Sequence, residues 1–597
     1  MNNLFKIEGT TLIGVTDEGK KMSRLVIPEG VTKIGKRAFY FCESLTSVTI
    51  PEGVTEIGVD AFRRCYSLES ITIPNSVTTI GDFAFNGCGS LKSVKIPNSV
   101  KSIEYAVFYG CTSLKSVTIP DSVKRIGNRA FYECESLKSV TIPDSVTEIG
   151  KYAFQDCKSL KSVIIPKGVT KIGQEVFYNC TSLTSVTIPE GVTSIGKRAF
   201  CFCESLTSVT IPEGVTEIGE IAFCYCTSLK SVTIPESVKV IGDSAFKDCK
   251  SLKSITIPDS VKKIGVCVFW GCRSLKSITI PESVTEIGNN AFYATPWLAT
   301  KCKENPLVIV NGILIDGSEC TGDVVIPEGV KVIPDRLFCF CESLKSVKIP
   351  NTVTEIGEEA FSACTSLKSV TIPKGVKVIG KQAFYGCDSL KSVKIPNSVT
   401  EIGYRVFGGC KSLKSVTIPE SVIIIGDFVF SDCTSLTSVK IPKGVKVIGQ
   451  EAFSSCISLE SIIIPEGVTK ICDRAFVGCE SLKSVKISEG ITEISDELFC
   501  DCGSLESIII PDSVKIICNR AFFRCKSLTS VTLGNNIKYI CDYAFADCIS
   551  LKNIIIPKNI TKMHVGDFIL DNTPWLSTNK ETLNRLKWNM RKKMMLS

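Results

Sequence analysis

The chain is 597 residues long, with 69 Lys and Arg residues, 61 Asp and Glu residues, and a formal net charge of +8. Hydrophobic residues make up 44% of the chain and charged residues 22%, which excludes a largely disordered protein. The single histidine, His564, excludes metal sites that need two His ligands. It leaves Ser-His-Asp or Cys-His catalysis only if His564 itself takes part.

A 23-residue repeat accounts for almost the whole sequence. Residues 45–67 read LTSVTIPEGVTEIGVDAFRRCYS, and the next 23 residues follow the same template. The Phe of the template recurs every 23 residues from Phe39 to Phe292 and again from Phe338 to Phe568. This spacing predicts two arrays of 12 and 11 coils with no slip of phase within either. A fixed period of this length indicates a solenoid, in which each coil packs only on its neighbours.

Each coil is expected to contribute one short strand. Residues 47–50, Ser-Val-Thr-Ile, alternate polar and apolar side chains, which predicts a strand that buries Val48 and Ile50. Pro51 ends the strand, and the apolar positions from Val54 to Cys65 then supply the opposite wall. The predicted fold class is a repeat solenoid. It has short parallel β-strands in one long curved sheet and compact turn or short helical segments on the other wall.

The repeat resembles a known family. Residues 45–62, LTSVTIPEGVTEIGVDAF, are similar to the BspA-like (Treponema-type) leucine-rich repeat, and the resemblance covers nearly the whole chain. It implies a curved leucine-rich repeat solenoid and a cell-surface or secreted protein that adheres to matrix proteins, to cells or to other microbes. The residues alone show no signal peptide and no apolar run of about 18 residues, so by themselves they favour a cytoplasmic location and predict no transmembrane segment.

Both arrays end in the same four residues, Thr-Pro-Trp-Leu, at 295–298 and 573–576. At these ends the periodic Cys is lost, and the spacing places Thr295 and Asp571 at its position. Terminal repeats cover an exposed core edge, so we expect the two Trp residues to act as lids. The predicted organisation is an N-terminal cap with array 1 over residues 1–303, a second cap-like coil with array 2 over 304–576, and a basic tail over 577–597.

No catalytic, cofactor or metal site is predicted. Of the 31 cysteines, 21 occupy the periodic core position, where we expect buried thiols; the alternative is a disulfide between stacked neighbours about 5 Å apart. The pairs Cys201/Cys203 and Cys224/Cys226 do not place both sulfurs on one face of a turn, so they are not read as a zinc site. Because no non-repeated polar constellation interrupts the period, we expect the protein not to be an enzyme.

A row of lysines marks the exposed side of the predicted sheet, here called the sheet face. The residue after the repeat Leu is Lys in 13 of 21 coils, beside rows of Ser and Thr. In the first array these are Lys92, Lys115, Lys138, Lys161, Lys230, Lys253 and Lys276. The row is either a solvated face that keeps the sheet soluble or a basic surface for an acidic protein or a glycan. No specific nucleic-acid partner is expected, because base-stacking aromatic residues are absent from the row.

Aromatic residues follow the repeat Phe in the first array and form what is here called the aromatic edge. The candidates for contact with a partner are Tyr109, Tyr132, Tyr178 and Trp270. These rings are either interface anchors or covers that fold over the gaps between coils. The second array carries mostly Gly, Ser or Ala at these positions.

The sequence therefore favours a non-enzymatic leucine-rich repeat scaffold that binds a protein or glycan through the sheet face and the aromatic edge. The alternatives are an intracellular scaffold and a purely structural spacer. The tail, with six Lys and Arg residues against one Glu, is expected either to form a capping helix or to attach weakly to an anionic surface.

Overall fold

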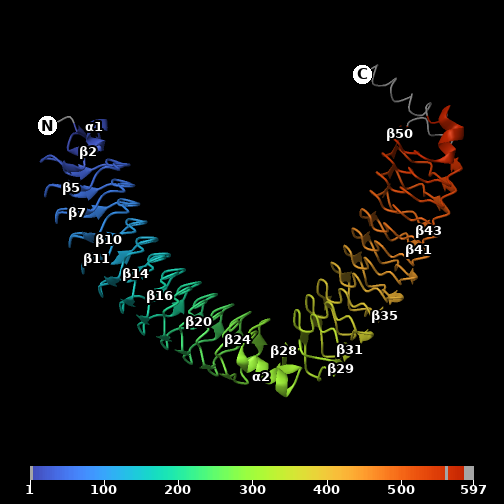
Figure 1. Ribbon diagram of the computed structural model, residues 1–597, viewed down its shortest axis with the longest axis horizontal. Coiled ribbons are helices and arrows are strands. Elements are labelled where there is room, and N and C mark those ends of the chain that lie inside the picture. Colours follow the sequence, from blue (N-terminus) through green and yellow to red (C-terminus); the bar gives the residue numbers. More distant parts are fainter. Residues whose placement is uncertain (1–3, 558–562, 582, 584–597) are drawn as a thin grey trace. The chain divides into compact units, whose positions relative to one another are not determined.

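The computed structural model describes residues 4–557, 563–581 and 583. Contacts divide the chain into two units, Met1–Glu304 and Asn305–Ser597. Each unit is a β-solenoid in which successive coils stack on one another (Figure 1). The predicted fold class, a repeat solenoid of short parallel strands, is confirmed.

The Ser-Val-Thr segments form the predicted parallel strands. In the first unit they follow β3 (Arg24–Val26) and start every 23 residues from β5 (Ser47–Thr49) to β25 (Ser277–Thr279). In the second unit they follow β29 (Gly322–Val325) and β31 (Leu344–Lys348), and start every 23 residues from β33 (Ser369–Thr371) to β49 (Asn553–Ile555). Neighbours pair in register, as Ser116 with Ser139, which places identical positions of successive coils side by side.

A second ladder of strands forms another wall, where turns or short helices were expected. These strands have two residues each and run from β4 (Lys33–Ile34) to β26 (Glu286–Ile287) and from β30 (Val332–Ile333) to β50 (His564–Val565). They also pair in parallel, as Ile126 with Ile149. The expectation of a single sheet was therefore wrong, because a strand of two residues is too short to show an alternation of polar and apolar side chains.

The third wall consists of turns, and no helix occurs within the described regular coils. Two residues in each coil have left-handed backbone conformations, as Arg37 (φ 59°) and Phe41 (φ 60°) do. A left-handed residue stops a helix and costs about 1–2 kcal/mol. The amide groups instead donate to the next coil, as from Phe39 N to Ala61 O at 2.7 Å. The predicted short helical segments are thus replaced by turns bonded from coil to coil.

The core is a stack of phenylalanine rings beside a row of thiols. The ring centroids of Phe154 and Phe177 are 5.6 Å apart, and Phe177 and Phe200 follow at 5.4 Å, all fully buried. Each periodic thiol from Cys65 onward, except Cys341, donates to a Phe carbonyl of the preceding coil, as Cys180 Sγ does to Phe154 O at 3.2 Å. Cys341 Sγ donates instead to Gly317 O of the cap, at 3.2 Å. All 31 cysteines are free thiols. The thiols therefore satisfy their polar hydrogen inside the core without disulfides.

The last coil of the second unit is out of phase with the repeat. Tyr539 pairs with His564, 25 residues away and not 23. As a result Phe568 takes the left-handed position and is 51% exposed, while Leu570 fills the place of the buried Phe. The prediction of an unbroken phase to Phe568 was wrong, because a Phe happens to stand at the expected spacing although two extra residues precede it.

Threonine replaces the periodic Cys at both array ends because it caps a helix. Thr295 Oγ accepts a hydrogen bond from Leu298 N at 3.1 Å at the start of α2 (Pro296–Glu304). Thr573 Oγ accepts from Leu576 N in the same way, at 3.3 Å, where residues 574–581 are helical. A proline in the first helical turn follows each Thr, as helix starts prefer. The predicted counterpart Asp571 was thus wrong by two residues.

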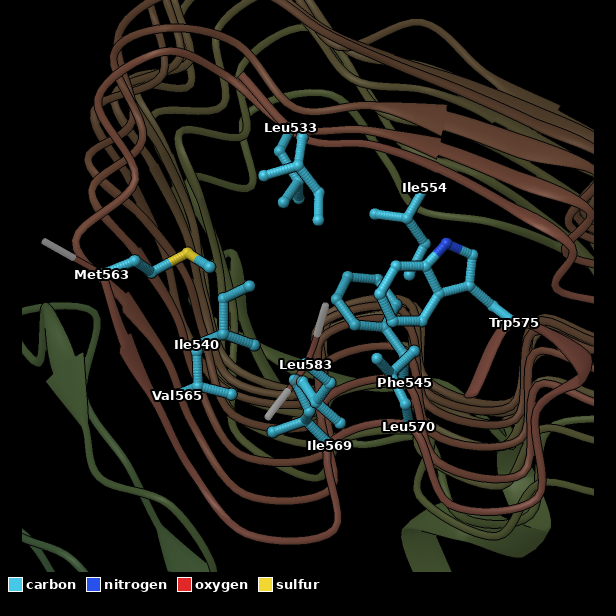
Figure 2. Close-up of a pocket in the computed structure, with 11 residues that line it drawn as sticks. Leu533, Ile540, Phe545, Ile554, Met563, Val565, Ile569, Leu570, Trp575 and Leu583 are labelled. Carbon is cyan, nitrogen blue, oxygen red and sulfur yellow. The ribbon is translucent and has the colours of Figure 1, made fainter. Parts of the chain in front are cut away.

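The caps close both ends of each unit. The first unit begins with the antiparallel hairpin β1 (Phe5–Glu8) and β2 (Thr11–Val15), followed by α1 (Asp17–Lys20), and the second with β27 (Val308–Val310) and β28 (Ile313–Asp316). At the end of the second unit, Trp575, Met563 and Leu583 point into the last coil (Figure 2). The space they leave is apolar and about 20 Å³, little more than one water, so it is cap packing and not a ligand site.

Removal of one lid should loosen the end of the first unit. The Trp297 ring is 8% exposed and lies 4.8 Å from the Phe292 ring, centroid to centroid. We expect Trp297→Ala to destabilise the last coils by about 3–5 kcal/mol, through lost burial and the resulting cavity. Hydrogen exchange of peptides from residues 254–295 should accelerate. Trp270→Ala, on the half-buried aromatic edge, is the matched control, and equal acceleration by both variants would contradict the lid role.

Candidate binding surfaces

The lysine row lies on the exposed side of the long strands. All seven predicted lysines are exposed: Lys92, Lys115, Lys138, Lys161, Lys230, Lys253 and Lys276. Four of them stand on consecutive coils and are joined through the backbone, as from Lys115 N to Lys92 O at 2.9 Å. Because coils repeat at about 4.8 Å, these four side chains form one continuous basic row.

The row is only partly neutralised. Lys92 Nζ lies 2.6 Å from Glu69 Oε2 on the preceding coil. In the described part of the chain, no carboxylate oxygen lies within 4.0 Å of the Lys115, Lys138 or Lys161 ammonium nitrogen. Three adjacent cations on a strand ladder repel one another unless water, salt or an anionic partner screens them.

The rings of the aromatic edge are half-buried and stack from coil to coil. The centroids of Tyr109 and Tyr132 are 4.7 Å apart with nearly parallel rings, and burial raises the pKa of Tyr132 to about 12. Tyr178 meets Phe202 edge-on at 5.6 Å, and the Trp270 ring lies 4.7 Å from that of Tyr293. The rings thus cover the gaps between coils and still leave one side accessible.

A groove of about 590 Å³ opens beside this edge in the first unit, over the coils from residue 63 to residue 133. Its walls include Arg63, Arg64, Phe83, Tyr105, Tyr109 and Arg129. Of the predicted residues only Tyr109 lines it; the lysine row, Tyr178 and Trp270 do not. The groove therefore brings together arginines that the sequence analysis did not select. The signal that could have found it is the pair Gly87 and Gly110, on successive coils at a position where the flanking coils carry Arg64 and Glu133.

The buried thiols of the core ionise only at high pH. Desolvation raises the pKa of Cys88 and of Cys410 to about 12, because the thiolate would lose its water inside the core. Cys201 and Cys224 also contact each other and are buried. Among the described residues, no group of three or more His, Cys, Asp or Glu side chains is arranged to hold a metal ion.

Sequence comparison identifies the repeat. The family model "BspA type Leucine rich repeat region" matches six times, over residues 18–134, 101–230, 193–309, 317–433, 400–522 and 446–573. The chain belongs to the BspA-type leucine-rich repeat family. Leucine-rich repeat proteins of this kind are binding scaffolds and are not known as enzymes. A search of curated proteins found no significant match.

Several solved structures of leucine-rich repeat proteins are similar in sequence to this BspA-type chain. A protein from Bacteroides ovatus is 29% identical, with 67% of this chain and 87% of that chain covered and a TM-score of 0.31. The T. pallidum leucine-rich repeat protein is 30% identical over 34% of this chain and 89% of its own, with a TM-score of 0.27. A leucine-rich cell surface protein from Faecalibacterium prausnitzii is 26% identical over 77% and 89%, with a TM-score of 0.28.

In the part of this BspA-type chain that the structure describes, no helix combines the length and the apolarity needed to cross a bilayer. The attachment role considered for the basic tail depends on residues 584–597, which lie outside the described residues.

Proposed function

We propose that this BspA-type protein is a non-enzymatic scaffold that binds an acidic protein or an acidic glycan across the sheet face of residues 1–303, with the aromatic edge beside it. The observation that supports the proposal is the row Lys92, Lys115, Lys138 and Lys161, whose last three ammonium groups have no carboxylate partner among the described residues. A polyanion would relieve their mutual repulsion. Many weak contacts at regular spacing on a rigid frame add through effective concentration.

The proposal extends to location and organisation. We propose a cell-surface or secreted role, as the family resemblance implies, and a division into the array of residues 1–303, the array of 304–576 and the tail of 577–597. Surface proteolysis of intact cells of the native host tests the location: an exposed scaffold is degraded, whereas a cytoplasmic one is protected.

Charge reversal on the sheet face tests the binding role. We expect the triple variant Lys115→Glu, Lys138→Glu and Lys161→Glu to weaken binding of the full chain to immobilised polyglutamate by about 10- to 100-fold at low salt. The dependence of affinity on salt should fall as well, because fewer ion contacts form. Surface plasmon resonance over a salt series measures both.

A control triple variant separates the sheet face from net charge. Lys101→Glu, Lys124→Glu and Lys239→Glu change the charge by the same amount, but these exposed lysines precede the two-residue strands of the other ladder. The control should retain most of the affinity. Equal losses in both variants would show a diffuse charge effect, and no saturable binding by the unmodified chain would favour a structural spacer.

A further inference from the structure

The groove beside the aromatic edge has a floor made by glycine. Gly87 and Gly110 occupy the same repeat position on successive coils, with φ of 75° and 68°. Their equivalents on the flanking coils are Arg64 and Glu133, which have nearly the same φ, 62° and 58°. The backbone conformation therefore does not require glycine here. What the two glycines provide is space, because a side chain at either position would occupy the groove.

The space can be filled without disturbing the fold. A Cβ atom added at Gly110 would lie 3.7 Å from the nearest atom, Gly87 Cα, and one at Gly87 would lie 3.5 Å from Arg64 Cγ. Both distances are ordinary van der Waals contacts. Phe41 and Phe202 show that an aromatic residue adopts this position in other coils, at φ of 60°. The opening thus depends on which side chains stand at this position and is not a demand of the repeat.

Two arginines around the groove differ from most arginines of the turn wall. Arg405 also stacks on aromatic rings without a carboxylate partner among the described residues, but most others pair with a carboxylate of a neighbouring coil, as Arg474 does with Glu497 at 2.9 Å. Arg64 and Arg129, by contrast, have no carboxylate oxygen within 4.0 Å among the described residues. The Arg64 guanidinium stacks on the Phe41 ring at 4.9 Å, measured to the centroid. The Arg129 guanidinium lies over the Tyr152 ring at 5.1 Å. Two guanidinium groups are therefore held in place by rings without a direct ion pair among the described residues, and Glu133 is the one carboxylate that lines the groove.

Other donors converge on the same space. Arg129 Nη1 donates to Tyr105 Oη at 2.8 Å, which fixes the guanidinium beside the phenol. Arg63 is held by Asp60 Oδ1 at 3.0 Å, and its buried Nε has no partner in the described structure. The groove thus offers planar, positively charged forks between aromatic faces, the arrangement that suits carboxylates attached to a ring with an apolar side.

We infer that this groove binds an acidic oligosaccharide, one that carries uronate or sialate carboxylates. The arginines would pair with the carboxylate, and Tyr66 and Tyr109 would pack against the sugar faces. An acidic peptide fits less well, because the floor has no free backbone donors for its carbonyls: Gly87 N already donates to Tyr109 O at 2.7 Å, and Gly110 N to Tyr132 O at 2.8 Å. The volume, about 590 Å³, lies within the range of roughly 300–1,000 Å³ of small-ligand sites.

This site is separate from the lysine row, so either proposal can fail alone. The probe is a printed array of uronate- and sialate-containing oligosaccharides, each beside its uncharged methyl ester. We expect the full chain to retain acidic members and not their esters. Gly110→Phe should lower affinity for those members by about 10- to 100-fold, because the ring fills the groove. Binding to polyglutamate through the sheet face should stay unchanged.

Two matched controls lie in the second unit. Gly478 stands at the same repeat position as Gly110, with φ of 71°, in the coil of Arg474, which pairs with Glu497; Gly478→Phe should leave glycan binding unchanged. Arg64→Gln should weaken binding as Gly110→Phe does, whereas Arg524→Gln, at the same repeat position but near Asp547, should not. The inference is overturned if no acidic glycan is retained, if esters bind equally, if Gly110→Phe binds normally, or if polyglutamate competes for the Gly110-dependent binding, which would assign the groove to acidic peptides.

Discussion

Alkaline solution should unfold both units, and each should unfold as the thiols of its core ionise. Burial raises the pKa of thiols in the core row, such as Cys88 and Cys410, to about 12, whereas a thiol in an unfolded chain ionises near pH 8.5. The stability that these groups confer is complete below about pH 8.5 and is lost as the pH rises towards 12. Each buried thiol then favours the unfolded state by about 1.4 kcal/mol per pH unit.

The number of thiols makes this effect large. The pKa of ten periodic thiols in the first unit and of nine in the second is raised, mainly by burial. At about 1.4 kcal/mol per pH unit from each, their sum in either unit exceeds a typical domain stability of roughly 5–15 kcal/mol by about pH 10. Far-ultraviolet circular dichroism and thiolate absorbance, followed together in a reducing buffer, should change in one transition. Thiolate absorbance that rises while the circular dichroism stays native would contradict the prediction.

Removal of thiols gives a quantitative control. A variant with Ala at Cys88, Cys111, Cys134 and Cys157 should release about four fewer protons when urea unfolds it at about pH 10, measured by pH-stat. Replacement of the half-buried Cys472 and Cys541, which lie outside the thiol row of the core and are less desolvated, should shift the alkaline transition less. This comparison shows whether the alkaline unfolding depends on the thiols buried in the core row or on the total number of cysteines.

The second large effect is expected at the centre of the phenylalanine stack. Phe177 is fully buried and stacks on Phe154 and on Phe200. Phe177→Ala should cost about 3–5 kcal/mol of local stability, since it leaves a cavity and removes two ring contacts. Because each coil contacts only its neighbours, the loss should be concentrated in the adjacent coils. Hydrogen exchange of peptides from residues 150–205 should therefore accelerate most.

Phe340→Ala is the matched control for the stack. Phe340 is also a phenylalanine in the turn wall of a coil, but its side chain is 72% exposed. Its replacement should change stability by no more than about 0.5 kcal/mol. If both variants exchange alike, or if Phe177→Ala loosens both units equally, nearest-neighbour stacking is not what stabilises the coils.

Sequence periodicity predicted the strands and the core well and the second wall poorly. Val117 and Phe177 are buried as expected because identical positions must stack when every coil has the same length. Strands such as β12 (Arg125–Ile126) have only two residues, and their hydrogen bonds join residues 23 positions apart, so no local pattern marks them. The prediction for the last coil was wrong because Phe568 keeps the 23-residue spacing in the sequence. Only the pairing of Tyr539 with His564 shows that two extra residues shift this coil.

For the binding surfaces, the sequence predicted which side chains form exposed rows, but not which charged side chains pair with each other. It placed Lys115 and Lys138 on the exposed side of the strands, where the structure has them. It selected Tyr109 but missed Arg64 and Arg129, since an arginine in a repeat position looks the same whether or not a carboxylate faces it.

The sequence alone therefore determined the coil, the family and most of the buried positions, because all of these follow from one period and from side-chain polarity. The tertiary structure decided which charges are compensated and where the surface is open. Those properties depend on unlike side chains meeting across neighbouring coils: Arg474 meets Glu497, whereas Arg64 lies beside the space above Gly87. A repeat fixes which positions are neighbours, but packing of the particular side chains there fixes what they contact.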